Sequence, residues 1–379
     1  MKNFVAHNPV TLHFGKGCTD TLGEVVSRYG KKVMLVLGKG SAKKYGYYDI
    51  VMRQFNAVKC EVIEFSGIKP NPLAADVDRA VKLARENSVE IIVALGGGSV
   101  IDSAKIMSLC IPEDLKAWNV MTGDAEPRSS LPLITVLTLA ATGTEMNAAA
   151  VLQDHNAGEK RGLRHPLNYP KHSFLDPSFT KTVSREYTAY GIADLIAHSL
   201  EAFFGDSDVS ITDRFVAEII KDAMHWAPLV LENPGNYDYR ANIMLDATFA
   251  LNEITLYGRT TGDWGVHTVG HVLSLLYDVP HGASLSIIYP AWLKLQKKRI
   301  PERIAKLGEL VFNTTNIDQI IQKFIKFFVF INSPVYLTDI GIDNTYKNDI
   351  VKQLSKNAAS GMVHKLNNED YHALVGFMM

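Results

Sequence analysis

The stretch EIIVALGGGSVIDSAKIMSL, residues 90–109, decides the fold, because it joins an apolar strand to a helix through three consecutive glycines. These are Gly96, Gly97 and Gly98. Glycine lets the backbone turn sharply and approach a phosphate, and the N–H groups at the start of the following helix favour an anion. One glycine would suffice for a tight turn, which remains the alternative, so three glycines favour a bound pyrophosphate.

The sequence on either side of this stretch repeats the same pattern. Short β-rich runs at 31–38, 61–67, 90–99 and 131–138 alternate with helical segments such as 74–88. This alternation predicts parallel strands with crossover helices, as in a Rossmann-like nucleotide-binding domain. Residues 147–166 are typical of a β-hairpin, because strand-like runs flank the turn-forming Asn156-Ala157-Gly158. Beyond the segment 174–180 helical patterns dominate, so we expect an α/β domain over 1–180 and an all-helical domain over 181–379, with the active site in the cleft between them.

Two local features extend the predicted phosphate site. Ser99 and Asp102 have the spacing of a capping box, which predicts where the helix after the glycines starts. A second junction at 135–147 also follows a strand, and its hydroxyl groups could line the same cofactor; these belong to Thr138, Thr142 and Thr144. Taken alone the second signal is weak, since threonine is a common helix cap.

Composition narrows the functional class. The chain has 379 residues, 21% of them charged, and a net charge of -1, which argues against a disordered chain and against a nucleic-acid binder. Three widely spaced cysteines without a C-x-x-C pattern suit a reducing compartment. We see no export signal and no apolar run of membrane-spanning length, so the sequence predicts a soluble, cytoplasmic protein.

A possible metal site begins with the segment GIADLIAHSLEAFF. It places Asp194 and His198 four residues apart, on one face of a helix. Such a pair is often only a surface contact. Here the neighbouring residues are apolar, so the face is expected to be buried, and a buried carboxylate needs a compensating cation.

Three further histidines follow within 15 residues, namely His267, His271 and His281. The first two are one helical turn apart, and the third stands in a Pro-His-Gly segment that we expect to be a loop. Each histidine alone could be an ordinary core residue or a cap. Asp194, His198 and two of the three would make a nitrogen and oxygen site for one divalent metal, Fe(II) or Zn(II), with a position open for substrate oxygen.

Together these motifs resemble the iron-containing (group III) alcohol dehydrogenases, most closely the butanol dehydrogenase branch. The resemblance covers nearly the whole chain and rests on F-G-K-G at 14–17, G-I-x-P-N-P at 67–72, G-G-G-S-x-x-D-x-x-K at 96–105, A-T-G-T-E at 141–145, and the later D-x-x-x-H and H-G elements. It implies hydride transfer between a nicotinamide and a short to medium-chain primary alcohol or aldehyde, similar to butanol and butanal. In such enzymes the metal polarises the substrate oxygen as a Lewis acid.

The resemblance also implies roles for single residues. The metal ligands would be Asp194, His198, His267 and His281, and His271 would be a proton relay near the nicotinamide. Further residues at the cofactor would be Asn71, Leu139, Asn147 and Lys160. Leu139 and Asn147, with Phe249 and Leu251, are also candidates for the border of the substrate pocket. The family usually forms homodimers, which edge pairing of the N-terminal strand would support.

Cofactor preference is a separate expectation. Members of the family that use NAD often carry Asp where this chain has Gly38, and such an acid binds the ribose 2′-hydroxyl. Lys39 and Ser41 follow, and then Lys43 and Lys44, so room and positive charge stand at this position. We therefore expect NADP(H) to be preferred over NAD(H).

Three alternatives remain open. A polyol dehydrogenase acting on glycerol or a diol shares the architecture, but glycerol-type enzymes usually retain an acid near Gly38. A lyase similar to dehydroquinate synthase shares the metal and the nucleotide but uses a different ligand set. A nucleotide- or metal-binding protein without catalysis is the alternative from another class, because a fold does not by itself prove a function.

Overall fold

The computed structural model describes residues 1–379, and the chain divides into two compact units. The sheet unit comprises His7–Val183 and Gly235–Met244. The helical unit comprises Met1–Ala6, Ser184–Pro234 and Leu245–Met379. None of the helices has both the length and the apolar character needed to cross a membrane.

The sheet unit is built on six parallel strands in the order β1-β8-β5-β4-β2-β3. Their bounds are β1 Thr11–Phe14, β2 Lys32–Gly38, β3 Glu61–Ile68, β4 Ile91–Gly96, β5 Leu133–Leu137 and β8 His172–Leu175. The four strands expected from β-rich runs are confirmed, and so is their parallel pairing. The expected Rossmann-like fold is therefore present.

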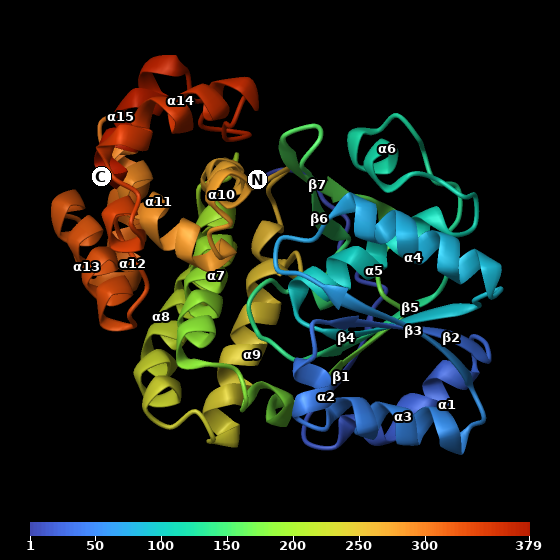
Figure 1. Ribbon diagram of the computed structural model, residues 1–379. Helices are drawn as coiled ribbons and strands as arrows, with labels where there is room; N and C mark the ends of the chain where they lie inside the picture. The colour runs from blue at the N-terminus through green and yellow to red at the C-terminus, as the bar shows by residue number, and fades with distance from the viewer. The chain divides into compact units, whose positions relative to one another are not determined.

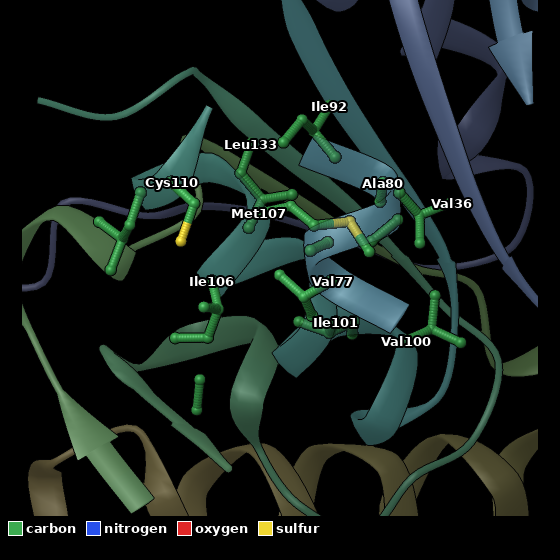
Figure 2. Close-up of a cluster of buried hydrophobic side chains, with 14 of the residues drawn as sticks. Val36, Val77, Ala80, Ile92, Val100, Ile101, Ile106, Met107, Cys110 and Leu133 are labelled. Carbon is green, nitrogen blue, oxygen red and sulfur yellow. The ribbon is translucent and has the colours of Figure 1, made fainter. Parts of the chain in front are cut away.

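Both faces of this sheet are buried. Along β2, Met34 and Val36 belong to one hydrophobic cluster, whereas Val33 and Leu35 belong to another. The first cluster packs against α4 Ala74–Glu86, α5 Gly98–Cys110 and α6 Ala117–Thr122, and Figure 2 shows part of it. The second packs against α1 Leu22–Ser27, α2 Ser41–Lys44 and α3 Tyr47–Ala57. Figure 1 shows α4 and α5 on one side of the sheet and α1 and α3 on the other. Two covered faces explain why the central strands β2, β4 and β5 are almost entirely apolar.

The expected hairpin is also present. Strands β6 Ala149–Asp154 and β7 Glu159–Arg164 pair antiparallel and form a separate two-stranded sheet. Gly158 has φ 67°, the left-handed conformation that favours glycine, and its N–H donates to the carbonyl of Asp154. The local turn chemistry therefore fixes the register of the two strands.

The helical unit contains no strand, as expected for the second half of the chain. Its longer helices are α7 Arg185–Phe203, α8 Ser210–Glu232, α10 Gly265–Tyr277, α11 His281–Gln296, α12 Pro301–Phe312, α13 Ile317–Phe330, α14 Lys347–Lys356 and α15 Asn368–Met378. Helix α9 Tyr237–Leu251 contributes residues to both units. The division into functional domains at residue 180, with an active site between them, stays a prediction.

Candidate metal centre and nucleotide site

Helix α7 presents an acid and an imidazole from its buried face. Asp194 is 2% exposed and His198 is 4% exposed, so the expected burial of this face is confirmed. The helix starts at a regular cap, because the Ser184 hydroxyl accepts a hydrogen bond from the N–H of Tyr187. Apolar neighbours on α7 keep the two polar side chains away from water, where a charge requires a partner.

Two further helices bring histidines to the same place. His267 and His271 lie on α10, and His281 is the first residue of α11, after the N-cap residue Pro280. The expectation that His281 stands in a loop is therefore wrong, since the helix begins with it. The next residue is Gly282, at which an added Cβ would lie 2.0 Å from the carbonyl oxygen of Tyr190 on α7. The small residue thus permits the close approach of α11 to the helix that carries Asp194.

The four predicted ligands converge on one carboxylate oxygen. Asp194 Oδ1 lies 3.7 Å from His198 Nε2, 3.8 Å from His267 Nε2 and 3.7 Å from His281 Nε2. These distances are too long for hydrogen bonds, and this buried oxygen has no hydrogen-bond partner. Donor atoms about 2.0–2.2 Å from one tetrahedral metal stand roughly 3.3–3.6 Å apart, only slightly closer than these atoms.

The ligand atoms of Asp194, His267 and His281 form the tightest group, all within 4.8 Å of one another. His198 adjoins this group, and its ring stacks on that of His267 with the centroids 4.7 Å apart. The donor set of one carboxylate and three imidazoles suits Fe(II) or Zn(II). The residues present therefore fit a divalent metal.

The protonation of the cluster follows from burial and charge. Burial lowers the pKa of His198 to about 4 and leaves that imidazole neutral. Burial would also lower the pKa of His267, but the carboxylates of Asp194 and Glu201 raise it to about 9. Burial opposes ionisation of Asp194, yet the surrounding imidazoles keep its pKa well below the ordinary range. The carboxylate thus stays charged, and a divalent cation could take the place of the compensating proton.

The sequence analysis did not identify Glu201, whose carboxylate accepts hydrogen bonds from His267. Glu201 is 1% exposed, and its Oε1 accepts hydrogen bonds from the backbone N–H of His267 at 3.1 Å and from Nδ1 at 2.8 Å. A signal was available, because Glu201 follows His198 by three residues in a mainly apolar part of the helix. Residues with this spacing lie on the same helix face.

His271 stands apart from the four candidate ligands. It is half-buried on α10, and its ring centroid is 5.7 Å from that of His281. This placement is compatible with the relay role implied by the resemblance, which stays a prediction. Phe249 and Leu251, candidates for the substrate pocket, are half-buried near the end of α9, and their role is likewise a prediction.

The glycine turn differs from the expectation at its helix start. Helix α5 begins at Gly98 with Gly97 as N-cap residue and without a side-chain cap, so the predicted capping box of Ser99 and Asp102 is wrong. Asp102 is buried and accepts hydrogen bonds elsewhere, at 2.6 Å from the Thr144 hydroxyl and at 3.0 Å from the N–H of Val151. Its carboxylate thus ties the helix to the second junction and to the hairpin.

The structure also gives the glycines a packing role. A Cβ on Gly96 would lie 2.5 Å from Val100, and a Cβ on Gly98 would lie 2.7 Å from Thr142. At Gly97 the nearest atom would be the Cβ of Leu139, at 3.1 Å. Packing inside the protein therefore accounts for these glycines as well as any ligand does. The same contacts bring the two strand-end loops together, and the N–H of Thr138 donates to the carbonyl of Gly96 at 3.0 Å.

A buried lysine completes this arrangement. Lys105 is fully buried, and its ammonium donates to the Thr144 hydroxyl at 2.8 Å, to the Asn147 carbonyl at 2.8 Å and to the Ala149 carbonyl at 2.7 Å. The Asn147 amide in turn donates to the Gly143 carbonyl at 2.9 Å. The polar groups at the second junction therefore fix the backbone of the loop.

Residues expected near the adenine ribose lie around the end of β2. Gly38 is the last residue of the strand, and Lys39 and Ser41 follow it. A Cβ on Gly38 would lie 3.7 Å from its nearest neighbours, the Ile68 carbonyl and a methyl group of Val100, which is ordinary contact. The backbone at Gly38 therefore leaves room for a Cβ.

Two lysines of the predicted cofactor site already have partners within the protein. Lys43 pairs with Glu64 at 2.5 Å, so its charge is largely compensated and adds less to a phosphate site than the sequence suggested. Lys160 on the hairpin donates to the side-chain oxygen of Asn71 at 2.8 Å. The structure thus brings two of the predicted cofactor residues, Asn71 and Lys160, into contact.

Comparisons with known proteins identify the family of this chain. Residues 9–177 match the family model described as iron-containing alcohol dehydrogenase, and residues 188–375 match the model of the C-terminal part of the Fe-containing alcohol dehydrogenase family. The chain is 35% identical over 379 residues to a probable NADH-dependent butanol dehydrogenase of Bacillus subtilis, covering 98% of both chains. The chain belongs to the iron-containing alcohol dehydrogenase family.

Other members of the family also match over nearly the whole chain. The NADPH-dependent aldehyde reductase YqhD of Escherichia coli is 34% identical over 380 residues, with 98% of this chain and 96% of that protein covered. The crystal structure of an NADH-dependent butanol dehydrogenase from Thermotoga maritima superposes with a TM-score of 0.96 at 35% identity, covering 100% of this chain and 99% of that one. This iron-containing alcohol dehydrogenase thus has relatives named for either nicotinamide cofactor.

Proposed function

We propose that this iron-containing alcohol dehydrogenase interconverts short to medium-chain primary alcohols and aldehydes, similar to butanol and butanal, with a divalent metal and with NADP(H) as preferred cofactor. One observation carries the proposal. A buried carboxylate oxygen of Asp194 without a hydrogen-bond partner lies 3.7–3.8 Å from the Nε2 atoms of three histidines. This arrangement supports a site in which the four side chains share one metal ion.

The side chains define what the site can do. Asp194, His198, His267 and His281 would hold Fe(II) or Zn(II), which when bound supplies Lewis-acid polarisation of the substrate oxygen. One carboxylate and three neutral imidazoles carry a single negative charge, so the loaded site keeps a net positive charge for a developing alkoxide. The apolar face of α7 around Asp194 and His198 excludes water and strengthens this interaction.

His271 is the proposed proton relay. Its half-buried position beside His281 leaves the four-ligand set complete without it, so it could exchange the proton of the alcohol with solvent. We expect His271→Ala to retain bound metal and to change the pH–rate profile of kcat. An unaltered profile would remove His271 from the mechanism.

The preference for NADP(H) rests on the lack of an acid at Gly38 and on Lys39 beside it. We expect Gly38→Asp to shift the ratio of kcat/KM for NADPH over NADH towards NADH by about 10- to 100-fold, which is about 1.4 to 3 kcal/mol, because a carboxylate repels the 2′-phosphate and binds the free hydroxyl. A Cβ at this position would make only ordinary van der Waals contacts, so the variant is a fair test. Gly38→Ala is the matched control, and an equal shift in it would assign the effect to bulk.

The decisive experiment for the reaction uses metal-stripped protein reloaded separately with Fe(II) and Zn(II). Oxidation of NADPH and of NADH is then followed with butanal, and reduction of NADP⁺ and of NAD⁺ is followed with glycerol-type substrates. Metal-dependent turnover of butanal supports the proposal. Turnover restricted to polyols would favour the polyol alternative, and no turnover with any pairing would reject the aldehyde reductase proposal.

A cytoplasmic location and a homodimeric assembly also stay predictions. Light scattering in solution tests the homodimeric assembly.

A further inference from the structure

Glu201 is a buried carboxylate that no step of the proposed reaction uses. It lies on α7 with Asp194 and His198, at spacings of seven and three residues, so the three side chains share one helix face. Its Oε1 accepts two hydrogen bonds from His267, from the backbone N–H and from the ring Nδ1. Glu201 therefore contacts a candidate metal ligand rather than the metal position itself.

The direction of the ring hydrogen bond fixes the state of the imidazole. A carboxylate can only accept, so His267 Nδ1 carries a proton, and the neutral ring then has its lone pair on Nε2. That Nε2 is buried without a hydrogen-bond partner and lies 3.8 Å from Asp194 Oδ1. The tautomer selected by Glu201 is therefore the one that can bind a metal at the predicted centre.

Burying the Glu201 carboxylate costs free energy unless a nearby group compensates its charge. The backbone N–H of Asp263 donates to the carbonyl of Glu201 at 3.0 Å, which brings a second buried acid close to it. Burial and the charge of Glu201 raise the pKa of Asp263 to about 7. An acid held among apolar residues and beside another acid needs compensation, and His267 is the partner that Glu201 contacts.

We propose that Glu201 is a positioning residue of the metal centre, which holds His267 in the tautomer that binds through Nε2 and increases the basicity of that nitrogen. The proposal rests on the proposed function, because it needs the metal site at Asp194. Hydrogen bonding of a ligating histidine to a carboxylate orients the ring and strengthens its bond to the metal. The expected loss on removing such a partner is about 10- to 100-fold in metal affinity.

The test measures binding of Co(II) to the metal-stripped full-length protein, with chelator competition for affinity and the visible absorption bands of Co(II) for ligand geometry. Glu201→Leu removes both acceptors and should weaken binding about 10- to 100-fold and change the bands. Glu201→Gln keeps an acceptor oxygen but loses the charge, so it should fall between wild type and Glu201→Leu. Glu186→Gln is the matched control, since Glu186 is exposed on the same helix and accepts a hydrogen bond only from Tyr190 at 3.0 Å among its described contacts.

Each outcome separates the two proposals. Wild type that binds no Co(II), or binds it equally well after His281→Ala, contradicts the proposed metal site. Wild type that binds at this site, with both Glu201 variants matching its affinity and absorption, overturns the positioning role. If Glu201→Leu does not fold, Glu201→Gln decides alone: weaker binding with altered bands supports the proposal, and wild-type behaviour overturns it.

Discussion

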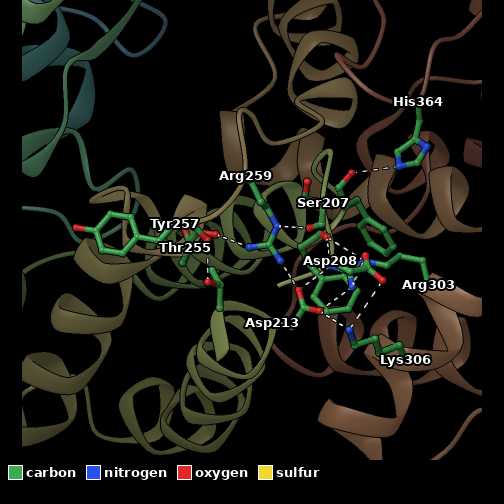
Figure 3. A network of polar contacts seen from close by, with 12 residues as sticks. Ser207, Asp208, Asp213, Thr255, Tyr257, Arg259, Arg303, Lys306 and His364 are labelled. Atoms are coloured by element: carbon green, nitrogen blue, oxygen red, sulfur yellow. Dashed lines mark hydrogen bonds and ion pairs between the residues drawn. The ribbon is translucent and has the colours of Figure 1, made fainter. Parts of the chain in front are cut away.

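Two buried aspartates of the helical unit, Asp213 and Asp194, are each surrounded by three basic side chains, but at different distances. Figure 3 shows Asp213 in contact with Arg259, Arg303 and Lys306. Arg303 Nη1 and Lys306 Nζ each lie 2.7 Å from Asp213 Oδ2, so the acid is fully engaged. Asp194 has three imidazole nitrogens at 3.7–3.8 Å and none at hydrogen-bond distance.

The difference separates an acid that is paired within the protein from one that is predicted to be a metal ligand. Around Asp213 the protein itself supplies the cations, and nothing is left for an ion to bind. Around Asp194 the donor atoms are spaced for a shared metal, and the acid is compensated only in part. Removing each acid should therefore change a different property of the protein.

The largest effect is expected for Asp194→Asn. Loss of the anionic ligand should abolish tight metal binding and lower kcat/KM with butanal roughly a thousandfold, about 4 kcal/mol of transition-state stabilisation. The metal-free protein should lose only on the order of 1 kcal/mol of stability, because the imidazoles can become neutral when the carboxylate is removed. Metal content and steady-state kinetics measure the first effect, and denaturant unfolding measures the second. Retained metal and turnover would contradict the assignment of Asp194 as a ligand.

Asp213→Asn should have the opposite profile. It leaves three cations around a neutral amide, and arginine cannot lose its charge, so we expect a loss of about 3–5 kcal/mol in the free energy of unfolding. Metal content per folded molecule should stay as in wild type. Asp208→Asn is the matched control, because Asp208 meets Arg303 at 3.0 Å but is 67% exposed and should cost less than about 1 kcal/mol. Equal losses in both variants would contradict the comparison.

A third buried aspartate extends the comparison with a smaller, pH-dependent effect. Asp246 is 7% exposed, and burial together with the nearby charge of Asp222 raises its pKa to about 8. Because this folded-state pKa lies above the unfolded value, the stabilising contribution is complete below pH 4 and is lost as the pH rises through 8. Asp246→Asn should therefore unfold about 2–4 °C above wild type at pH 9, with a smaller difference at pH 5. Asp222→Asn should reduce the same pH dependence. If the melting temperatures of wild type and Asp246→Asn differed by the same amount at pH 5 and pH 9, the assignment would be contradicted.

Features that depend on local sequence patterns could be predicted from the sequence. The burial of Asp194 and His198 followed from the apolar residues that flank them, and the parallel strands followed from apolar runs between helices. The short strands β1 and β8, of four residues each, are too brief to give such a pattern. The family resemblance then chose His267 and His281 from three histidines, which spacing alone could not do.

What the sequence could not predict depends on contacts between distant segments. The capping-box spacing of Ser99 and Asp102 was misleading, because the Asp102 carboxylate accepts hydrogen bonds from Thr144 and Val151 instead. Both residues are more than 40 positions away in the sequence. Glu201 acquires its place only because α10 brings His267 back to α7, 66 residues later in the chain. Local patterns carry no information about such pairings.

Gly282 sets the spacing of α7 and α11 at the predicted metal centre without contributing a polar atom. With an added Cβ only 2.0 Å from the Tyr190 carbonyl, any larger residue would move the start of α11 away from α7. His281 and Asp194 are carried by those two helices, so the backbone spacing sets the distance between two predicted ligands. Since metal–ligand bonds tolerate only about 0.2 Å of change, the size of ion that the predicted centre would accept is encoded partly by the absence of a side chain.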